Sequence, residues 1–235
     1  MKIIADGIGK RFNRDWIFKN ISISIENCTT LAITGPNGSG KSTLLQVLSS
    51  ITVPTTGTVS FFYEQKKIHN DDCFQYMSFV APYQEIIEEM TVAELLNFHL
   101  KFKKLNITQA SEFLTYCGIH KGQNKEIRYF SSGMKQRVKL GLALLSDSQV
   151  LFLDEPTSNL DEQGTKWYLN EIQKQINKKT IVIASNIPEE YAFANQIISV
   201  NSGSNSNTEY SVLCTLYFFH HFPHNQIHPS FIHDC

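Results

Sequence analysis

Apolar residues follow two different periods along the chain, and the first is the period of two that is typical of a strand with one buried face. It is clearest at 21–25, which reads Ile-Ser-Ile-Ser-Ile, and a weaker apolar run covers 2–8. These two runs predict a pair of antiparallel strands at the start of the chain. The other apolar runs that predict strands are 31–33, 58–63, 76–80, 150–153, 180–184 and 196–200.

The second period is helical and occupies the middle of the chain. Thr91-Val92-Ala93-Glu94 has the pattern of a capping box, in which a threonine and a glutamate three residues later satisfy the first backbone N–H groups of a helix. Residues 85–147 therefore predict a mostly helical insert within a strand-rich frame. A further helix is expected to begin at Asp161 and to carry apolar residues as far as Ile176.

Strands that alternate with helices predict an α/β fold, and we expect residues 1–200 to form a single domain. After this the composition changes abruptly, because 201–207 consists of asparagine, serine and glycine. We expect 201–235 to be a low-complexity linker followed by a poorly ordered tail. The tail is rich in histidine, but the carboxylate or thiolate spacing of a metal site is missing, so a tail without metal is the favoured interpretation.

The composition excludes several classes of protein. Of 235 residues, 42% are hydrophobic and 18% are charged, and the formal net charge is -1, which indicates no general affinity for nucleic acid or anionic membranes. The sequence predicts neither a signal peptide nor a membrane span, since no apolar stretch approaches about 18 residues. Its five cysteines are scattered, which predicts no disulfide framework or zinc site and fits a reducing cytosol.

The segment from Gly35 to Thr43 matches the phosphate-binding pattern G-x-x-x-x-G-K-[ST] at every fixed position. An apolar strand candidate precedes it and an apolar helix candidate follows, which is the context that the pattern requires. Glycines let successive backbone N–H groups point at phosphate oxygens, and Lys41 can bridge the β- and γ-phosphates. The nucleotide-binding candidates here are Gly35, Asn37, Gly38, Ser39, Gly40, Lys41, Ser42 and Thr43.

Two acids follow the buried strand candidate 150–153. Asp154 can hold Mg²⁺ together with the Ser42 hydroxyl, and Glu155 can orient or deprotonate an attacking water. The alternative for an acidic pair at a strand end is a pair of solvated carboxylates. Behind a phosphate-binding loop, the catalytic interpretation is favoured.

With these motifs in order, the chain resembles an ATP-binding-cassette ATPase, the nucleotide-binding subunit of an ABC transporter, over about residues 1–200. Phe130-Ser131-Ser132-Gly133-Met134 stands where that family has its signature L-S-G-G-Q, and Ser158-Asn159-Leu160-Asp161 is similar to its D-loop. The resemblance implies a P-loop NTPase of the ABC type. Its RecA-like core has a mixed sheet, with an antiparallel N-terminal β-subdomain and an inserted helical subdomain at about 85–147.

The resemblance also implies partners. Two cassettes of this family meet head to tail, as a homodimer or a heterodimer, so Ser131 and the Gly133 N–H would contact the γ-phosphate of ATP held by the second chain. ATP and Mg²⁺ would be the cofactors, and a separate transmembrane permease would hold the cassette at the inner face of the cell membrane. Soluble cassettes that act on nucleic acid are disfavoured, because they usually carry two cassettes or a long coiled coil.

Several positions depart from the family pattern or need assignment. Ser132 and Met134 replace a glycine and the glutamine of the signature. Pro82 stands where relatives have the Q-loop glutamine, so Gln84 is the candidate Mg²⁺ and coupling residue. Asn186 stands at the position of the family's switch histidine. Phe12 falls where relatives keep an adenine-stacking aromatic, which favours stacking over core packing, and Trp16 is not assigned a role.

The function that follows is an ATP-hydrolysing motor subunit that dimerises around two Mg-ATP and drives a permease. Asparagine cannot carry the positive charge of histidine, so the Asn186 substitution predicts slow hydrolysis. The alternative is a degenerate ATP-binding clamp that hydrolyses little and pairs with a more active cassette. An intact Glu155 favours the active enzyme.

Overall fold

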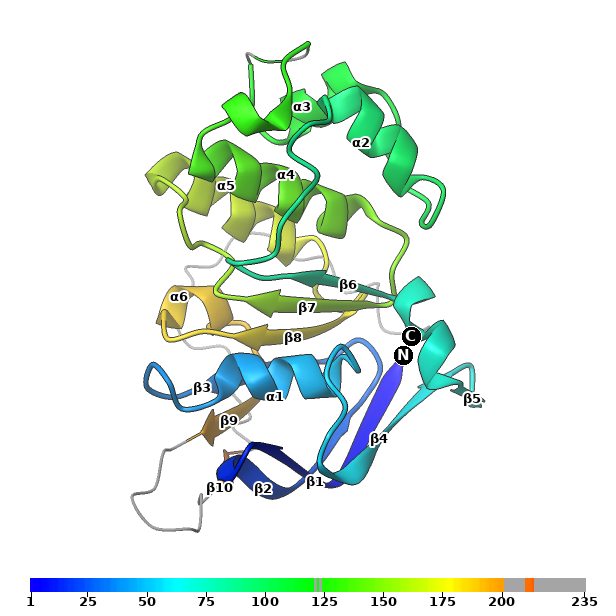
Figure 1. The fold of residues 1–235 in the computed structure, drawn as a ribbon, viewed down its shortest axis with the longest axis vertical. Helices are drawn as coiled ribbons and strands as arrows, with labels where there is room; N and C mark the ends of the chain where they lie inside the picture. Colours follow the sequence, from blue (N-terminus) through cyan, green and yellow to red (C-terminus); the bar gives the residue numbers. More distant parts are fainter. Residues whose placement is uncertain (121, 123, 201–209, 214–235) are drawn as a thin grey trace, which may run out of the picture.

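The computed structural model describes residues 1–120, 122, 124–200 and 210–213, the last of these as backbone. Its strands form two sheets, and Figure 1 shows the smaller sheet and the helices α2 and α3 at opposite ends of the molecule, with the larger sheet between them. The candidate catalytic residues Glu155 and Asn186 follow two strands of the larger sheet. Both sheets and the inserted helices agree with the ABC-type fold that the sequence predicts.

The smaller sheet is antiparallel and contains four strands in the order β2-β1-β4-β5. The predicted N-terminal pair is confirmed, since β1 pairs with β2 and places Ile3 opposite Ile25. Both strands are longer than the pattern predicted, because polar residues continue the pairing to the hairpin at Phe12 and Asp15. The bounds are Lys2–Phe12 for β1, Asp15–Ile25 for β2, Thr56–Tyr63 for β4 and Lys66–Ile68 for β5.

The larger sheet has six strands in the order β10-β9-β3-β8-β7-β6. Its five strands from β9 to β6 are parallel, and their near-continuous apolar sequences reflect burial on both faces. The carboxyl ends of parallel strands share one edge of a sheet, so the residues that follow β3, β6, β7 and β8 lie together there. The bounds are Thr30–Thr34 for β3, Met77–Val80 for β6, Val150–Asp154 for β7, Thr180–Ala184 for β8, Gln196–Val200 for β9 and Tyr210–Leu213 for β10.

The helical insert has its own core. Buried residues of α2, α3 and α4, among them Leu96, Phe113 and Val138, form a cluster separate from the cores beside the sheets. The capping box of α2 is present, with the Glu94 N–H donating to the Thr91 hydroxyl and the Thr91 N–H donating to Glu94. The bounds are Val92–His99 for α2, Ala110–Tyr116 for α3 and Ser132–Leu145 for α4, with a 3-10 turn at Ile127–Tyr129.

Three more helices each follow a strand of the larger sheet. They are α1 at Lys41–Leu48, α5 at Glu162–Gln173 and the short α6 at Pro188–Tyr191, and a 3-10 helix at Asn70–Gln75 precedes β6. Asp161 caps α5, as predicted, through a hydrogen bond from the Gly164 N–H. The expected extension to Ile176 is wrong, because the helix ends at Gln173 and Ile176 lies in the turn that follows.

The structure adds two strands that the sequence pattern did not predict, the short β5 and β10. β10 pairs antiparallel with β9, with Tyr210 opposite Val200 and Leu213 opposite Ile197. The expected linker and tail otherwise fall on 201–209 and 214–235, which lie outside the described residues. The histidines of the tail are among them.

Candidate functional site

The phosphate-binding loop follows β3 and leads directly into α1. Gly35 and Gly40 have φ values of 139° and 100°, in the left-handed region that favours glycine. A Cβ at Gly35 would lie 2.1 Å from the carbonyl oxygen of Val200, and a Cβ at Gly40 would lie 2.4 Å from Cγ2 of Ile17. The loop therefore requires glycine at both positions, for its backbone angles and for its close contact with β9 and β2.

Lys41 lies over the loop that precedes it and is 5% exposed. Its ammonium donates to the carbonyl oxygens of Gly35, at 2.8 Å, and Pro36, at 3.2 Å. Burial lowers the pKa of Lys41, while the nearby charges of Glu155 and Asp154 act in the opposite direction. The site thus holds a positive charge at the start of α1, in the region where the sequence places the phosphates.

Asp154 ends β7 and comes next to the phosphate-binding loop. Its carboxylate accepts a hydrogen bond of 3.0 Å from the Ser42 hydroxyl, although the two residues are 112 positions apart in the chain. Burial is the main cause that raises the pKa of Asp154, and the Ser42 hydrogen bond partly offsets it. A buried carboxylate beside a hydroxyl is an oxygen donor set that suits Mg²⁺, so these two residues fit the metal that the sequence implies.

Glu155 follows at once and has a positive φ of 41°. Its backbone N–H donates to the carbonyl oxygen of Ala184 at 2.9 Å, which holds the turn after β7 against the end of β8, while its side chain is exposed. Asn186 lies two residues beyond β8, and its side-chain amide donates to the Asn37 side chain at 2.8 Å. The structure therefore brings Asn186 onto the phosphate-binding loop.

The two aromatic residues of the first hairpin differ in their surroundings. Phe12 is 49% exposed, and the Lys10 ammonium lies 5.0 Å from the centre of its ring. Trp16 is half-buried, with the cationic groups of Arg11 and Lys19 at 5.4 Å and 5.0 Å from its ring. Phe12 is thus outside the core, as a stacking residue must be, whereas the Trp16 ring is already contacted by two cationic side chains.

Gln84 lies four residues beyond β6, the strand that pairs with β7. Its N–H donates to the carbonyl oxygen of Ala81 at 3.2 Å and closes a turn, and its side chain is exposed. Gln84 is therefore at the same edge of the sheet as Asp154.

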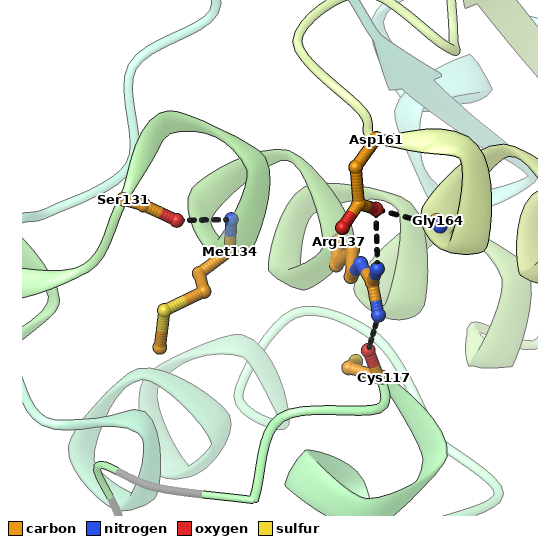
Figure 2. A network of polar contacts seen from close by, with 6 residues as sticks. All are labelled: Cys117, Ser131, Met134, Arg137, Asp161 and Gly164. Atoms are coloured by element: carbon orange, nitrogen blue, oxygen red, sulfur yellow. Dashed lines mark hydrogen bonds and ion pairs between the residues drawn. The ribbon is translucent and has the colours of Figure 1, made fainter.

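The signature segment surrounds the N-terminus of α4. Ser131 caps this helix, since its hydroxyl accepts a hydrogen bond of 3.2 Å from the Met134 N–H (Figure 2). A Cβ at Gly133 would lie 2.9 Å from the carbonyl oxygen of Asn159, so glycine lets the D-loop approach the helix closely. Ser131, Gly133 and Asn159 line one open hollow of about 410 Å³ on this face.

A comparison of the chain with models of protein families agrees with the order of these motifs. The model of the ABC transporter family matches residues 18–158, which include the phosphate-binding loop, the signature and the acidic pair. The chain belongs to the ABC transporter family. In the described part of this cassette, no helix combines the length and apolar character needed to cross a membrane.

Individual relatives of the cassette support the same assignment. The chain is 30% identical over 184 residues to YxlF of Bacillus subtilis (strain 168), an uncharacterized ABC transporter ATP-binding protein, covering 77% of this chain and 60% of YxlF. It is 28% identical over 210 residues to the sulfate/thiosulfate import ATP-binding protein CysA of Mesostigma viride, covering 86% of this chain and 60% of CysA. The chain thus spans 60% of the length of these two curated relatives.

A solved structure shows the same fold as this cassette. It is a dimeric, post-hydrolysis state of an ATP-binding cassette bound to ADP and Pi, with a TM-score of 0.73 and 22% sequence identity. The match covers 90% of this chain and 98% of that chain. At this level of identity, the likeness concerns the fold.

Arg137 is not among the predicted site residues, yet it joins three parts of the cassette (Figure 2). Its guanidinium, on α4, donates to the Asp161 carboxylate at the start of α5 at 2.7 Å. It also donates to the carbonyl oxygen of Cys117, at the end of α3, at 3.5 Å. The Gly164 N–H and Arg137 together hold the pKa of Asp161 below its usual range. Glycines at 118 and 164 leave room for the guanidinium, because a Cβ at either would lie within 3.0 Å of it.

Two further side chains hold the loop after Glu155. Gln136 is buried and donates to the carbonyl oxygen of Pro156 at 2.9 Å. Glu190 of α6 is 1% exposed, and its carboxylate accepts from the Thr157 N–H at 3.0 Å. A buried glutamate in a short helix carries no motif, so the sequence provides no signal for this contact.

Proposed function

We propose that this cassette binds and hydrolyses Mg-ATP and that its ATP cycle drives a separate membrane permease. The observation that carries the proposal is the hydrogen bond of 3.0 Å between Ser42 and Asp154, beside the buried ammonium of Lys41. It joins the start of α1 to the end of β7, so a phosphate-binding loop and an acidic group share one site. This is the arrangement that phosphoryl transfer from a nucleoside triphosphate requires.

The residues of the phosphate-binding loop would bind phosphate through their backbone, through Lys41 and through Ser42. The backbone N–H groups of 35–43 would bind phosphate oxygens, and Lys41 would bridge the β- and γ-phosphates. Lys41 then exchanges its contacts with the Gly35 and Pro36 carbonyls for phosphate. Ser42 and Asp154 would hold Mg²⁺, with Gln84 as a further candidate ligand at the same edge of the sheet. The bound metal would supply positive charge for the β- and γ-phosphate oxygens.

Glu155 and Asn186 would act at the γ-phosphate. Glu155 orients the attacking water or takes its proton, because its exposed carboxylate directly follows the buried Asp154. Asn186, held on Asn37, would donate a hydrogen bond to the γ-phosphate. A neutral amide stabilises the charge of the transition state less than an imidazolium does, so hydrolysis would be slow.

The signature segment of a partner cassette would complete the ATP site. The Ser131 oxygen already accepts from Met134, so its own proton is free to be donated to a γ-phosphate oxygen. Gly133 would offer its N–H beside it. In this proposal two chains, identical or different, bind two ATP between them, and the dimeric form of the similar cassette supports such an arrangement.

The remaining assignments concern adenine and the membrane. Phe12 would stack on the adenine ring, since its side chain is exposed beside the Lys10 ammonium. The cassette would act at the inner face of the cell membrane, bound to a permease whose cytoplasmic helix would lie near Gln84 and Glu85. No nucleic acid takes part.

The proposal is tested by phosphate release and ATP binding in the purified full chain and in Glu155→Gln. We expect Mg²⁺-dependent turnover in the wild type, and a rate lower by about 10²–10⁴-fold with ATP still bound in the variant. Unchanged turnover in Glu155→Gln would contradict the role of this carboxylate.

A second function, an ATP-binding clamp that hydrolyses little, is favoured by the amide at Asn186. It predicts ATP binding without turnover in the wild type and faster turnover in Asn186→His. An unchanged rate in Asn186→His would show that this position does not limit hydrolysis.

A further inference from the structure

A short turn connects the catalytic sheet with the helical insert. β6 ends at Val80, which lies opposite Leu153 and therefore next to Asp154. The turn 81–84 follows, closed by the hydrogen bond from Gln84 to Ala81, and it exposes Tyr83 almost completely at its tip. In Figure 1 the chain then runs past α4 on its way to α2.

This turn is held by a lysine of α4, the helix that begins in the signature segment. The Lys139 ammonium donates to the carbonyl oxygens of Ala81 at 3.1 Å, Pro82 at 3.1 Å and Gln84 at 3.3 Å. An ammonium has three donors, and three carbonyls from one turn satisfy all of them. Lys139 is only 9% exposed, and burial lowers its pKa. A buried cation that contacts only backbone oxygens of one turn fixes the position of that turn.

The neighbouring residues of α4 hold the other segments at the site. Lys135 pairs with Glu88 at 2.7 Å, farther along the chain from the turn. Gln136 contacts the loop that follows Glu155, and Arg137 contacts the start of α5. One helix, which Ser131 caps, thus contacts the turn 81–84, the loop after Glu155 and the start of α5.

We propose that Lys139 is a positioning residue that ties the turn 81–84 to α4 and sets the place of Gln84 at the edge of the sheet where Asp154 lies. A movement of α4, caused by contact of Ser131 with a nucleotide on a partner chain, would then move this turn as well. This inference rests on the proposed ATPase function and adds a coupling residue to it. Lys139 touches neither ATP nor metal in this scheme and acts through the carbonyls that it holds.

The test compares Lys139→Met with wild type in the full chain. Methionine keeps the length and apolar contacts of the lysine stem but removes its three donors. We expect hydrogen exchange of the Gln84 amide, which donates to Ala81, to rise by at least about tenfold, since the turn loses its anchor. We expect kcat for ATP to fall by about tenfold, with KM for ATP within about twofold of wild type, because Lys41 and its loop are unchanged.

Two further variants make the test specific. Lys139→Arg keeps the positive charge, but a planar guanidinium cannot converge on three carbonyls of one turn, so exchange and kcat should lie between those of wild type and Lys139→Met. Lys166→Met removes an exposed lysine of α5 that pairs with Glu162, and it should change neither quantity. Lys139→Arg also keeps the test valid if Lys139→Met does not fold.

The outcomes separate this inference from the proposed function. If the Gln84 amide of Lys139→Met exchanged as slowly as in the wild type, or if the loss of activity were entirely in KM, the role of Lys139 would be overturned. An absence of turnover in the wild type would contradict the proposed ATPase, while the exchange comparison would still decide whether Lys139 holds the turn.

Discussion

The phosphate-binding loop and the signature segment both lie at the N-terminus of a helix, yet they are built differently. Gly40, which precedes α1, has no side-chain oxygen, so the first N–H groups of that helix lack a side-chain cap. Ser131, which precedes α4, supplies one itself through its hydroxyl. The loop before α1 can therefore surround a phosphate with backbone N–H groups. The N-terminus of α4 instead offers the hydroxyl proton of Ser131 and the N–H of Gly133.

What the two helices share is equally informative. Among the six α-helices in the described part of the chain, α1 and α4 have no acidic residue in their first turn, while α2, α3, α5 and α6 do. A carboxylate in the first turn compensates the positive end of a helix dipole. The two helices expected to contact ATP keep that positive end uncompensated.

The two regions also differ in their electrostatic effect on stability. Burial opposes the charges of Lys41 and Asp154, so it lowers the pKa of the first and raises that of the second. Near the signature segment, by contrast, the Gly164 N–H and then Arg137 favour the ionised form of Asp161. We infer that the first region carries an electrostatic penalty before ATP arrives and that the second supports the fold.

The largest effect is expected from Lys41→Met. Without the ammonium, the γ-phosphate loses a charge-assisted contact of about 1.5–3 kcal/mol, which corresponds to about 10–100-fold in ATP affinity. Calorimetric titration with Mg-ATP measures this loss, and Lys166→Met is the matched control. Wild-type affinity in Lys41→Met would show that the loop binds nucleotide through its backbone alone.

Ser132→Glu sharpens the comparison of the two helices. A carboxylate in the first turn of α4 should stabilise that helix slightly but repel the γ-phosphate on the partner chain. We expect ATP binding by the monomer to be unchanged and ATP-dependent dimerisation, followed by sedimentation, to weaken by at least about tenfold.

Ser132→Gln, of similar size but without charge, should keep the dimer. Equal dimerisation by both variants would mean that the N-terminus of α4 does not face an anion.

A smaller effect, on stability, is expected from Arg137→Met. The variant leaves Asp161 and the Cys117 carbonyl without their donor, and we expect the midpoint of thermal unfolding to fall by several degrees. The Gly164 N–H is the first cause of the lowered folded-state pKa of Asp161 and Arg137 the second. The part of the stabilisation that comes from Arg137 and Asp161 is therefore present above the ordinary pKa of about 4 and is lost as the pH falls through the folded-state value. A difference from wild type that stayed constant down to pH 2 would contradict this explanation.

The smallest effect on stability is expected from Asp154→Asn, and its sign is opposite to that of Arg137→Met. The folded-state pKa of Asp154 is raised, so its ionised form opposes folding above that value, and the penalty vanishes below the ordinary pKa. Asparagine can keep the contact with Ser42 without the charge. At pH 7 the apo variant should therefore unfold at a slightly higher temperature than wild type, while turnover is lost; a lower midpoint would contradict the electrostatic penalty.

The sequence predicted the parts of the site that local patterns encode. The glycines and lysine of the phosphate-binding loop occupy one contiguous segment between a strand and a helix, and Asp154 and Glu155 directly follow an apolar strand. Parallel strands end at one edge of a sheet, so the order of the motifs was enough to place Ser42 and Asp154 together. The capping box at Thr91 was predictable for the same reason, since its partners are three residues apart.

Tertiary structure alone decided the contacts between distant segments. Asn186 donates to Asn37 across 149 positions, and Lys139 reaches the turn at Ala81 across 58 positions. The close approach of Gly133 to Asn159 likewise depends on how α4 packs against the D-loop. No period or spacing in the sequence encodes these pairs, because they arise where separate helices and strands meet. The motifs thus encode the residues of the candidate site, and tertiary packing decides the contacts between them.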